Sequence, residues 1–297
     1  MIYPTFLINL DHHVRRRAFM EEQFAALDLP LTRLGAALGR DPAVRAQAAV
    51  AGYATLTHGE IGCFESHRWF WRHVVTENLP GAFVIEDDVV IASDFGQIRF
   101  PDTLLQQADV IKIDQGVRNI CAYGTVPVGL ENGRNLYRLL GTEYSTGCYF
   151  VTQRGARRLL EASRGYFVPV DRFMFDQDSK AFWSFDIWKL DPSAAVQYRL
   201  FDPDDDVQTE IDDSISANRL SGRDETPGMN MIKQTRLRMR RLVDWDFRRI
   251  REARKARKLE EFARLEPIET RKVAFHSASS SHVEPARKAL GSEVSAE

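Results

Sequence analysis

The sequence has few cysteines and lacks the common phosphate-binding loops. Its three cysteines, Cys63, Cys121 and Cys148, form neither a CxxC pair nor a regular framework. They indicate a reducing compartment and argue against a structural zinc site. There is no GxxxxGK[ST] loop, and no GxGxxG follows the first apolar segment. Any bound diphosphate would therefore need another means of charge neutralisation.

Long apolar runs are also missing. No stretch approaches the roughly 20 apolar residues of a membrane-spanning helix. No basic residue precedes the first apolar stretch, which is too short for an export signal. We therefore expect a soluble cytoplasmic protein. Its 297 residues can form one large domain or two modest ones.

Charge is distributed unevenly along the chain. Residues 233–258 hold twelve Lys/Arg against three acids, whereas residues 1–232 are acidic overall. Leu242, Trp245 and Phe247 give the basic segment an apolar side. It could be an interfacial helix on an anionic membrane, peripheral to the inner face of the cytoplasmic membrane. It could equally pack against the acidic body. Nucleic acid is not expected as a partner, because no binding motif accompanies the basic residues.

The first half of the chain alternates strand and helix patterns. Residues 5–10 read as a strand, residues 11–30 as a helix, and a short strand follows. This β-α-β order favours a parallel sheet. Thr57 and Glu60 form a T-x-x-E capping box at the start of another helix. Further short strands are expected at 108–114, 167–175 and 185–190.

The most informative stretch is GAFVIEDDVVI, residues 81–91. Short apolar runs flank Glu86, Asp87 and Asp88. Such runs suit a strand that is buried on both faces. Three adjacent acids resist burial unless they are paired, protonated or bound to a cation. The stretch therefore predicts either a solvated acidic turn or a divalent-metal site at the end of a central strand.

Several segments in order resemble glycosyltransferase family 25, whose members include lipopolysaccharide-biosynthesis enzymes. HGEIGCFESH (58–67) and VIEDDV (84–89) are similar to the family's G-E-x-G-C-x-x-S-H block and E-D-D strand. FLINLDHHVRRR, ADVIKID, TGCYFVTQRGARRLLE and VPVDRFMF also match family segments. The resemblance spans roughly residues 3–220, and it leaves out the basic segment and the tail.

The resemblance implies an α/β, GT-A-like fold with a Rossmann-like, mostly parallel central sheet flanked by helices. We expect this domain over residues 1–225, a basic amphipathic helical extension over 226–266 and a disordered tail over 267–297. The implied reaction is the inverting transfer of a hexose, typically galactose, from a UDP-sugar. The implied acceptor is a lipid-linked oligosaccharide of lipopolysaccharide or lipooligosaccharide.

The resemblance also implies site residues. Glu86, Asp87 and Asp88 stand at the family's DxD-like position, and Glu86 and Asp88 are the expected ligands of Mn²⁺ or Mg²⁺. Asp171, in the P-V-D element, could act as the base, although a turn aspartate is an equal alternative. Asp176, Asp178 and Asp186 are its competitors by position.

Two further groups are expected near the nucleotide. Uridine or ribose would lie by the turn that includes Asn9 and Leu10. Arg15 is the first of three consecutive arginines, Arg15 to Arg17, which could reach phosphate or form a solvated helix face. Glu60 and His67 share one helix face. They could ligate metal, but a buried histidine that shapes the nucleotide pocket is the commoner outcome.

Two rival functions stay open. A metal-dependent phosphoryl-transfer enzyme could use the same carboxylates, but it would need ligands for a second ion. A non-catalytic saccharide- or membrane-binding protein could keep the same scaffold. Metal-dependent binding of UDP-sugars would distinguish the glycosyltransferase from both.

Overall fold

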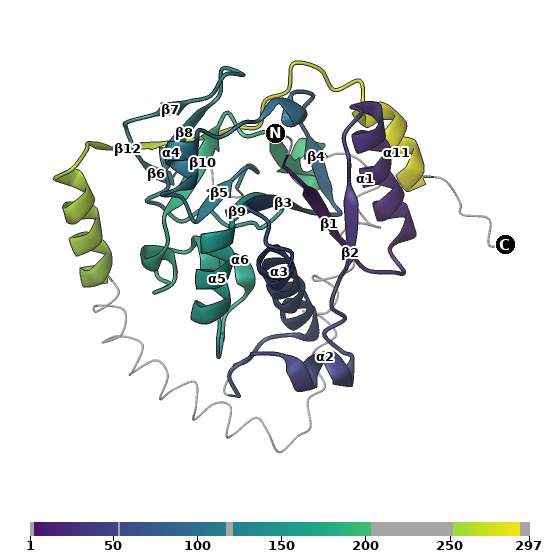
Figure 1. The fold of residues 1–297 in the computed structure, drawn as a ribbon, viewed down its shortest axis with the longest axis horizontal. Coiled ribbons are helices and arrows are strands. Elements are labelled where there is room, and N and C mark those ends of the chain that lie inside the picture. Colours follow the sequence, from purple (N-terminus) through teal and green to yellow (C-terminus); the bar gives the residue numbers. More distant parts are fainter. Residues whose placement is uncertain (1–2, 53, 117–120, 203–251, 292–297) are drawn as a thin grey trace.

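The computed structural model describes residues 3–52, 54–116, 121–202 and 252–291. At its centre lies an eight-stranded sheet (Figure 1). Its strands, in spatial order, are β2 (Thr32–Gly35), β1 (Thr5–Asn9), β3 (Gly81–Glu86), β9 (Cys148–Thr152), β5 (Val110–Lys112), β10 (Ile187–Asp191), β8 (Asn135–Arg138) and β7 (Val128–Gly129). Six strands run in one direction, and β9 and β8 run against them. The predicted α/β fold with a mostly parallel sheet is confirmed.

Helices cover both faces of this sheet because successive strand residues point to opposite sides. Phe83 and Ile85 pack in one core with helix α1 (Val14–Ala26) and helix α11 (Val283–Gly291). Val84, between them, packs in the other core. Helices α3 (His58–Thr76), α5 (Gln153–Ala162) and α6 (Val170–Phe175) cover that second face.

Local signals explain how the site elements begin and end. The capping box of α3 is present, since the Thr57 side chain accepts the Glu60 N–H and the Glu60 carboxylate accepts the Thr57 N–H. Strand β3 ends at Glu86, and Asp87 and Asp88 form a turn into β4 (Val89–Ile91). Strand β4 pairs with β11 (Ala195–Gln197), which leads into α7 (Tyr198–Phe201). The turn is therefore flanked by two paired strands, β3 in the central sheet and β4 against β11.

The remaining elements are short or lie away from this edge. They are α2 (Pro42–Gln47), η1 (Phe95–Gln97), α4 (Asp102–Leu105), β6 (Cys121–Gly124), η2 (Phe182–Ser184) and β12 (Ile268–Arg271).

Two expectations are wrong. The segment around Asp171 was expected to be a strand but forms helix α6, because a short apolar run does not distinguish strand from helix. The tail, expected to be disordered, is folded in its described part: β12 pairs with β6, and α11 packs along α1. Val283, Ala286 and Leu290 are buried there, which gives the tail an apolar face.

The basic segment is described only in part. Residues 252–258 belong to a helix over 252–263, drawn in light green in Figure 1. Near its end, the Phe262 ring lies 6.5 Å from the Trp183 ring and 5.4 Å from the Arg138 guanidinium carbon. Residues 233–251 and the predicted boundary at 225 lie outside the described residues. Among the described helices, none is long and apolar enough to cross a bilayer.

Candidate active site

A cleft of about 650 Å³ opens at the end of strands β1 and β3. Its walls come from the start of α1, the first turns of α3, the turn after β3, the start of α6 and the residues after β11. It brings together eight of the nine predicted site residues: Asn9, Leu10, Glu60, His67, Glu86, Asp87, Asp88 and Asp171. Arg15 is not among the lining residues, whereas Arg16 is.

Asp87 is the acid that anchors the turn. Asn9 Nδ2 donates a hydrogen bond to its Oδ2 at 2.8 Å. The guanidinium of Arg16 lies 2.5 Å from its Oδ1. The Asp87 side chain is 9% exposed. A buried carboxylate paired in this way fixes backbone geometry and has little capacity left for a ligand.

Asp88 is placed differently. Its Oδ1 is buried and has no hydrogen-bond partner among the described residues. Its Oδ2 lies 3.8 Å from Arg16. Burial raises the pKa of Asp88 to about 7, and the charges of Glu86 and Asp87 add to the increase while Arg16 opposes it. A cation or an added hydrogen-bond donor at this carboxylate would relieve that excess of negative charge.

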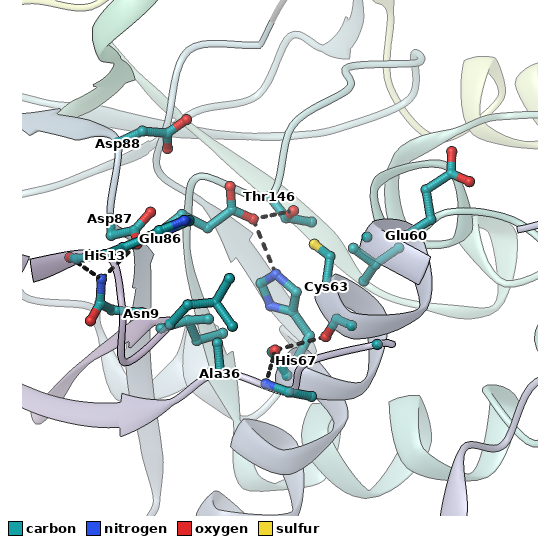
Figure 2. A pocket seen from close by; sticks show the side chains of 18 of the residues that line it. Asn9, His13, Ala36, Glu60, Cys63, His67, Glu86, Asp87, Asp88 and Thr146 are labelled. Atoms are coloured by element: carbon teal, nitrogen blue, oxygen red, sulfur yellow. Dashed lines mark hydrogen bonds and ion pairs between the residues drawn. The ribbon is translucent and has the colours of Figure 1, made fainter. Parts of the chain in front are cut away.

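Glu86 turns away from the other two acids (Figure 2). Its Oε1 accepts a hydrogen bond from Thr146 Oγ1 at 2.7 Å and lies 3.1 Å from His67 Nε2. Burial acts to raise the pKa of Glu86, but the hydrogen bonds from His67 and Thr146 prevail and leave that pKa below its ordinary value. Glu86 therefore stays ionised.

The proton on His67 can be placed from its neighbours. Trp71 Nε1 can only donate, and it lies 2.8 Å from the Tyr149 hydroxyl oxygen. The Tyr149 hydrogen then points to His67 Nδ1, 2.9 Å away. His67 consequently carries its proton on Nε2 and donates it to Glu86. His67 is buried and lines the cleft, and its role in shaping a nucleotide pocket stays a prediction.

The remaining predicted residues, Glu60 and Asp171, line the cleft from α3 and α6. Glu60 serves the α3 capping box through its Oε2. Asp171 lies in the first turn of α6, and its Oδ1 accepts the Arg172 N–H at 2.8 Å. Burial raises the pKa of Asp171. Of the four acids that compete for the role of base, Asp171 alone lines the cleft.

Sequence reasoning missed several lining residues. Arg16 rather than Arg15 faces the acids, because it shares a helix face with the buried Met20 and Gln23 of α1. Arg199, at the start of α7, lines the cleft beside Gln197, whose Oε1 accepts its Nη2–H at 3.0 Å. The three- and four-residue spacing from Arg16 was present in the sequence. The position of Arg199 depends on the β4–β11 pairing, which the sequence does not reveal.

The donor set can be compared with the expected Mn²⁺ or Mg²⁺. Both ions prefer oxygen ligands. Asp88 fits, since it lines the cleft and one of its carboxylate oxygens is buried without a hydrogen-bond partner among the described residues. Glu86 has one oxygen bonded to His67 and Thr146, so the two predicted metal ligands are turned toward different neighbours.

Comparisons with known proteins find a matching family model and several relatives. A family model described as "Glycosyltransferase family 25 (LPS biosynthesis protein)" matches residues 2–174. Procollagen galactosyltransferase 1-B of Xenopus laevis is 30% identical over 186 residues, which is 57% of this chain and 30% of that protein. A Haemophilus influenzae protein, provisionally named a glycosyltransferase, is 25% identical over 226 residues, or 70% of this chain and 74% of its own.

Other matches limit what can be transferred. The human "Inactive glycosyltransferase 25 family member 3" is 32% identical over 147 residues, which is 46% of this chain and 24% of that protein. The chain thus spans under a third of the animal relatives named here. A crystal structure of a glycosyltransferase involved in the glycosylation of the major capsid of PBCV-1 covers 62% of this chain and 69% of its own, with 11% identity and a TM-score of 0.29. That likeness is too low to carry an argument.

Proposed function

The chain belongs to glycosyltransferase family 25, and on that premise we propose that it transfers a hexose from a UDP-sugar to a saccharide acceptor. The proposed hexose is galactose, and the proposed acceptor is a lipid-linked oligosaccharide of lipopolysaccharide or lipooligosaccharide. We further propose that the transfer inverts the anomeric centre. The protein would then be cytoplasmic, where UDP-sugars are made available.

One observation carries the proposal. The buried Asp88 Oδ1 has no hydrogen-bond partner among the described residues, and Asp88 lines the cleft together with Arg16. A buried carboxylate oxygen without a hydrogen-bond partner is costly unless something binds it. A divalent cation carried by a nucleotide diphosphate would offset the negative charge of the Asp88 carboxylate.

Asp88 would hold Mn²⁺ or Mg²⁺, assisted by Glu86, whose second oxygen remains available in the cleft. Such an ion would offset the negative charge that develops on the departing diphosphate. Arg16 and the exposed Arg199 both line the cleft with Asp88 and could contact phosphate oxygens. Asn9 and Leu10 would lie by the uridine.

Asp171 is the proposed base. It lines the wall of the cleft formed by the start of α6, and burial raises its pKa toward the range where a general base works best. As the acceptor hydroxyl attacks the anomeric carbon, its proton passes to the Asp171 carboxylate. The bond between that carbon and the diphosphate oxygen breaks, and UDP departs on the opposite face of the sugar.

The basic segment 233–258 would hold the enzyme at the inner face of the cytoplasmic membrane. Its many lysines and arginines suit anionic headgroups, each contributing about 1 kcal/mol near such a surface. A lipid-linked acceptor is found at that surface. The segment's apolar residues would lie at the headgroup boundary.

A second candidate is a non-catalytic saccharide-binding protein on the same scaffold. It is favoured by one finding: a human relative carries the word inactive in its name. Phosphoryl transfer has weaker support. Among the described residues, the one close group of three ligand-type side chains includes a thiol instead of a second set of carboxylates.

Release of UDP from UDP-galactose, UDP-glucose and UDP-N-acetylglucosamine should be measured with Mn²⁺ and lipooligosaccharide acceptors. The transferase predicts acceptor-dependent release with one preferred sugar. Release from none of the donors, together with retained glycan binding, would favour the non-catalytic candidate. Hydrolysis of simple phosphate esters without any preference for UDP would point to phosphoryl transfer.

A further inference from the structure

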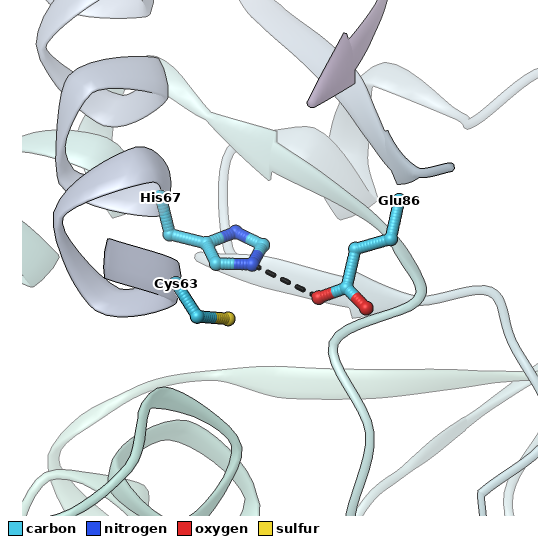
Figure 3. A group of neighbouring side chains, drawn as sticks. All are labelled: Cys63, His67 and Glu86. Carbon is cyan, nitrogen blue, oxygen red and sulfur yellow. Dashed lines mark hydrogen bonds and ion pairs between the residues drawn. The ribbon is translucent and has the colours of Figure 1, made fainter. Parts of the chain in front are cut away.

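Three side chains of different chemistry that line the cleft lie next to one another (Figure 3). Cys63 and His67 lie one helical turn apart on α3, so they project from the same face. Glu86 reaches them from the end of β3. One potential metal ligand from each residue lies within 4.8 Å of the others.

We propose that Cys63, His67 and Glu86 form a binding site for a divalent transition metal of the Zn²⁺ class. Thiolate, imidazole and carboxylate are all ligands that such ions accept in tetrahedral geometry. Three protein ligands leave the fourth position open, and here it would face the cleft, because all three residues line it. Sites of this composition with an open position bind water or a substrate atom.

This site differs from the one proposed at Asp88. Mn²⁺ and Mg²⁺ are hard cations that prefer oxygen ligands, as at a carboxylate with diphosphate oxygens. The thiol of Cys63 instead selects softer ions. The two sites share only Glu86, which is turned toward His67 and Thr146 and away from Asp88. Ion type can therefore separate them in experiment.

The structure is close to the bound geometry but must adjust. Bonds of about 2.0–2.3 Å to the metal require the ligand atoms to approach more closely than 4.8 Å. Burial raises the pKa of the Cys63 thiol, which must lose its proton when the metal binds, and that one proton passes to solvent through the open cleft.

Metal binding also changes the proton on His67. Its Nε2 becomes a ligand, and the ring proton moves to Nδ1. That proton then points to the Tyr149 oxygen, which already accepts from Trp71. The Tyr149 hydrogen loses its present acceptor, and Glu86 loses its bond from His67. The hydrogen bond between Tyr149 and His67 is therefore reversed and the one between His67 and Glu86 is lost, in exchange for three metal bonds. Trp71 and Tyr149 continue to orient the ring.

Cobalt provides a direct test, because a thiolate bound to Co²⁺ gives a charge-transfer absorption that oxygen ligands do not. The reduced full-length protein should be titrated with Co²⁺ alone and then with Zn²⁺. We expect one equivalent of Co²⁺ to produce the thiolate band and Zn²⁺ to remove it. Cys63→Ser should lose the band. The matched control, Cys121→Ser, alters a buried cysteine outside the cleft and should keep it.

Absence of the band in the wild-type protein, or its survival in Cys63→Ser, would overturn the proposal. If Cys63→Ser does not fold by circular dichroism, Glu86→Gln replaces it. That variant should keep the thiolate band but bind Co²⁺ at least about tenfold more weakly, and unchanged affinity would overturn the three-ligand site. UDP titration with Mg²⁺ on the wild type and on Cys63→Ser tests the transferase proposal separately, since that proposal requires no thiolate.

Discussion

The Nε2–H of His67 donates to the Oε1 of Glu86 across 3.1 Å, joining helix α3 to the end of strand β3 inside the cleft. His67 is fully buried, and its other ring nitrogen is held by Tyr149. The Glu86 carboxylate is thus oriented by a chain of buried hydrogen-bonded side chains that runs from Trp71 through Tyr149 to His67. Positioning of this kind is what a binding site needs from the residues behind it.

Removal of the Tyr149 hydroxyl should test this chain. Tyr149→Phe leaves the Trp71 N–H and His67 Nδ1 without their buried partner. We expect the free energy of unfolding to fall by about 1–3 kcal/mol. Urea denaturation measures it, with Tyr137→Phe at a partly exposed tyrosine of β8 as the control. Equal stability of the two variants would mean that the chain does not orient His67.

Asp88 should make stability depend on pH. Its pKa is raised from 3.8 to about 7 in the folded protein, so the folded state binds this proton more tightly than the unfolded state. The free energy of unfolding therefore falls as pH rises from 4 to 7. Asp88→Asn removes this loss.

The stability of Asp88→Asn relative to wild type should thus increase between pH 4 and pH 8, by an amount on the order of 2–4 kcal/mol. Denaturation at both pH values measures the difference, and Asp178→Asn at an exposed position serves as the control. A constant difference across this range would contradict the buried, charge-crowded environment described for Asp88.

Asp171 should matter for turnover and not for donor binding. Asp171→Asn keeps the size of the side chain but cannot accept the acceptor's proton. We expect kcat to fall by at least about a hundredfold, while the affinity for UDP with Mn²⁺ stays within about twofold of wild type. UDP release and calorimetry measure the two quantities.

The matched variant for this experiment is Asp176→Asn, at an acid that lies outside the cleft and accepts a hydrogen bond from Tyr144. Loss of turnover in Asp176→Asn with normal turnover in Asp171→Asn would show that Asp171 is not the base.

The basic segment should govern membrane binding. Replacing Arg236, Arg238, Arg240 and Arg241 by glutamine removes four positive charges. At about 1 kcal/mol each, affinity for vesicles rich in anionic lipid should fall by roughly 10²–10³-fold. Vesicle sedimentation measures the change, and neutral vesicles are the control. Unchanged binding to anionic vesicles would refute the interfacial role of the segment.

The parts of the fold with local signals were predictable. The T-x-x-E box fixes the start of α3, and the apolar runs around Glu86 identify β3 and β4. The tail was misjudged although Val283, Ala286 and Leu290 have helical spacing. Its serine-rich surroundings obscured that signal, and its stability comes from packing on α1, which lies far away in sequence.

Within the site, the residue types were predictable but their directions were not. Glu86, Asp87 and Asp88 are consecutive, yet their surroundings differ. Glu86 contacts His67 and Asp87 pairs with Arg16, whereas one oxygen of Asp88 has no hydrogen-bond partner among the described residues. Those partners come from α3 and α1, so only tertiary packing decides which acid is left for a ligand. For the same reason Arg16, and not the predicted Arg15, lines the cleft. The rotation of α1 against the sheet decides which arginine of the run contacts the acids.

The central claim is that Asp88 binds a divalent ion together with the diphosphate of a UDP-sugar. Calorimetric titration of UDP and UDP-galactose into wild type and Asp88→Asn, with Mn²⁺ and with EDTA, tests it most directly. We predict binding to wild type with Mn²⁺, and at least about tenfold weaker binding with EDTA or in the variant. Equal affinity of wild type and Asp88→Asn, with Mn²⁺ and with EDTA alike, would contradict the account. So would a failure of wild type to bind UDP.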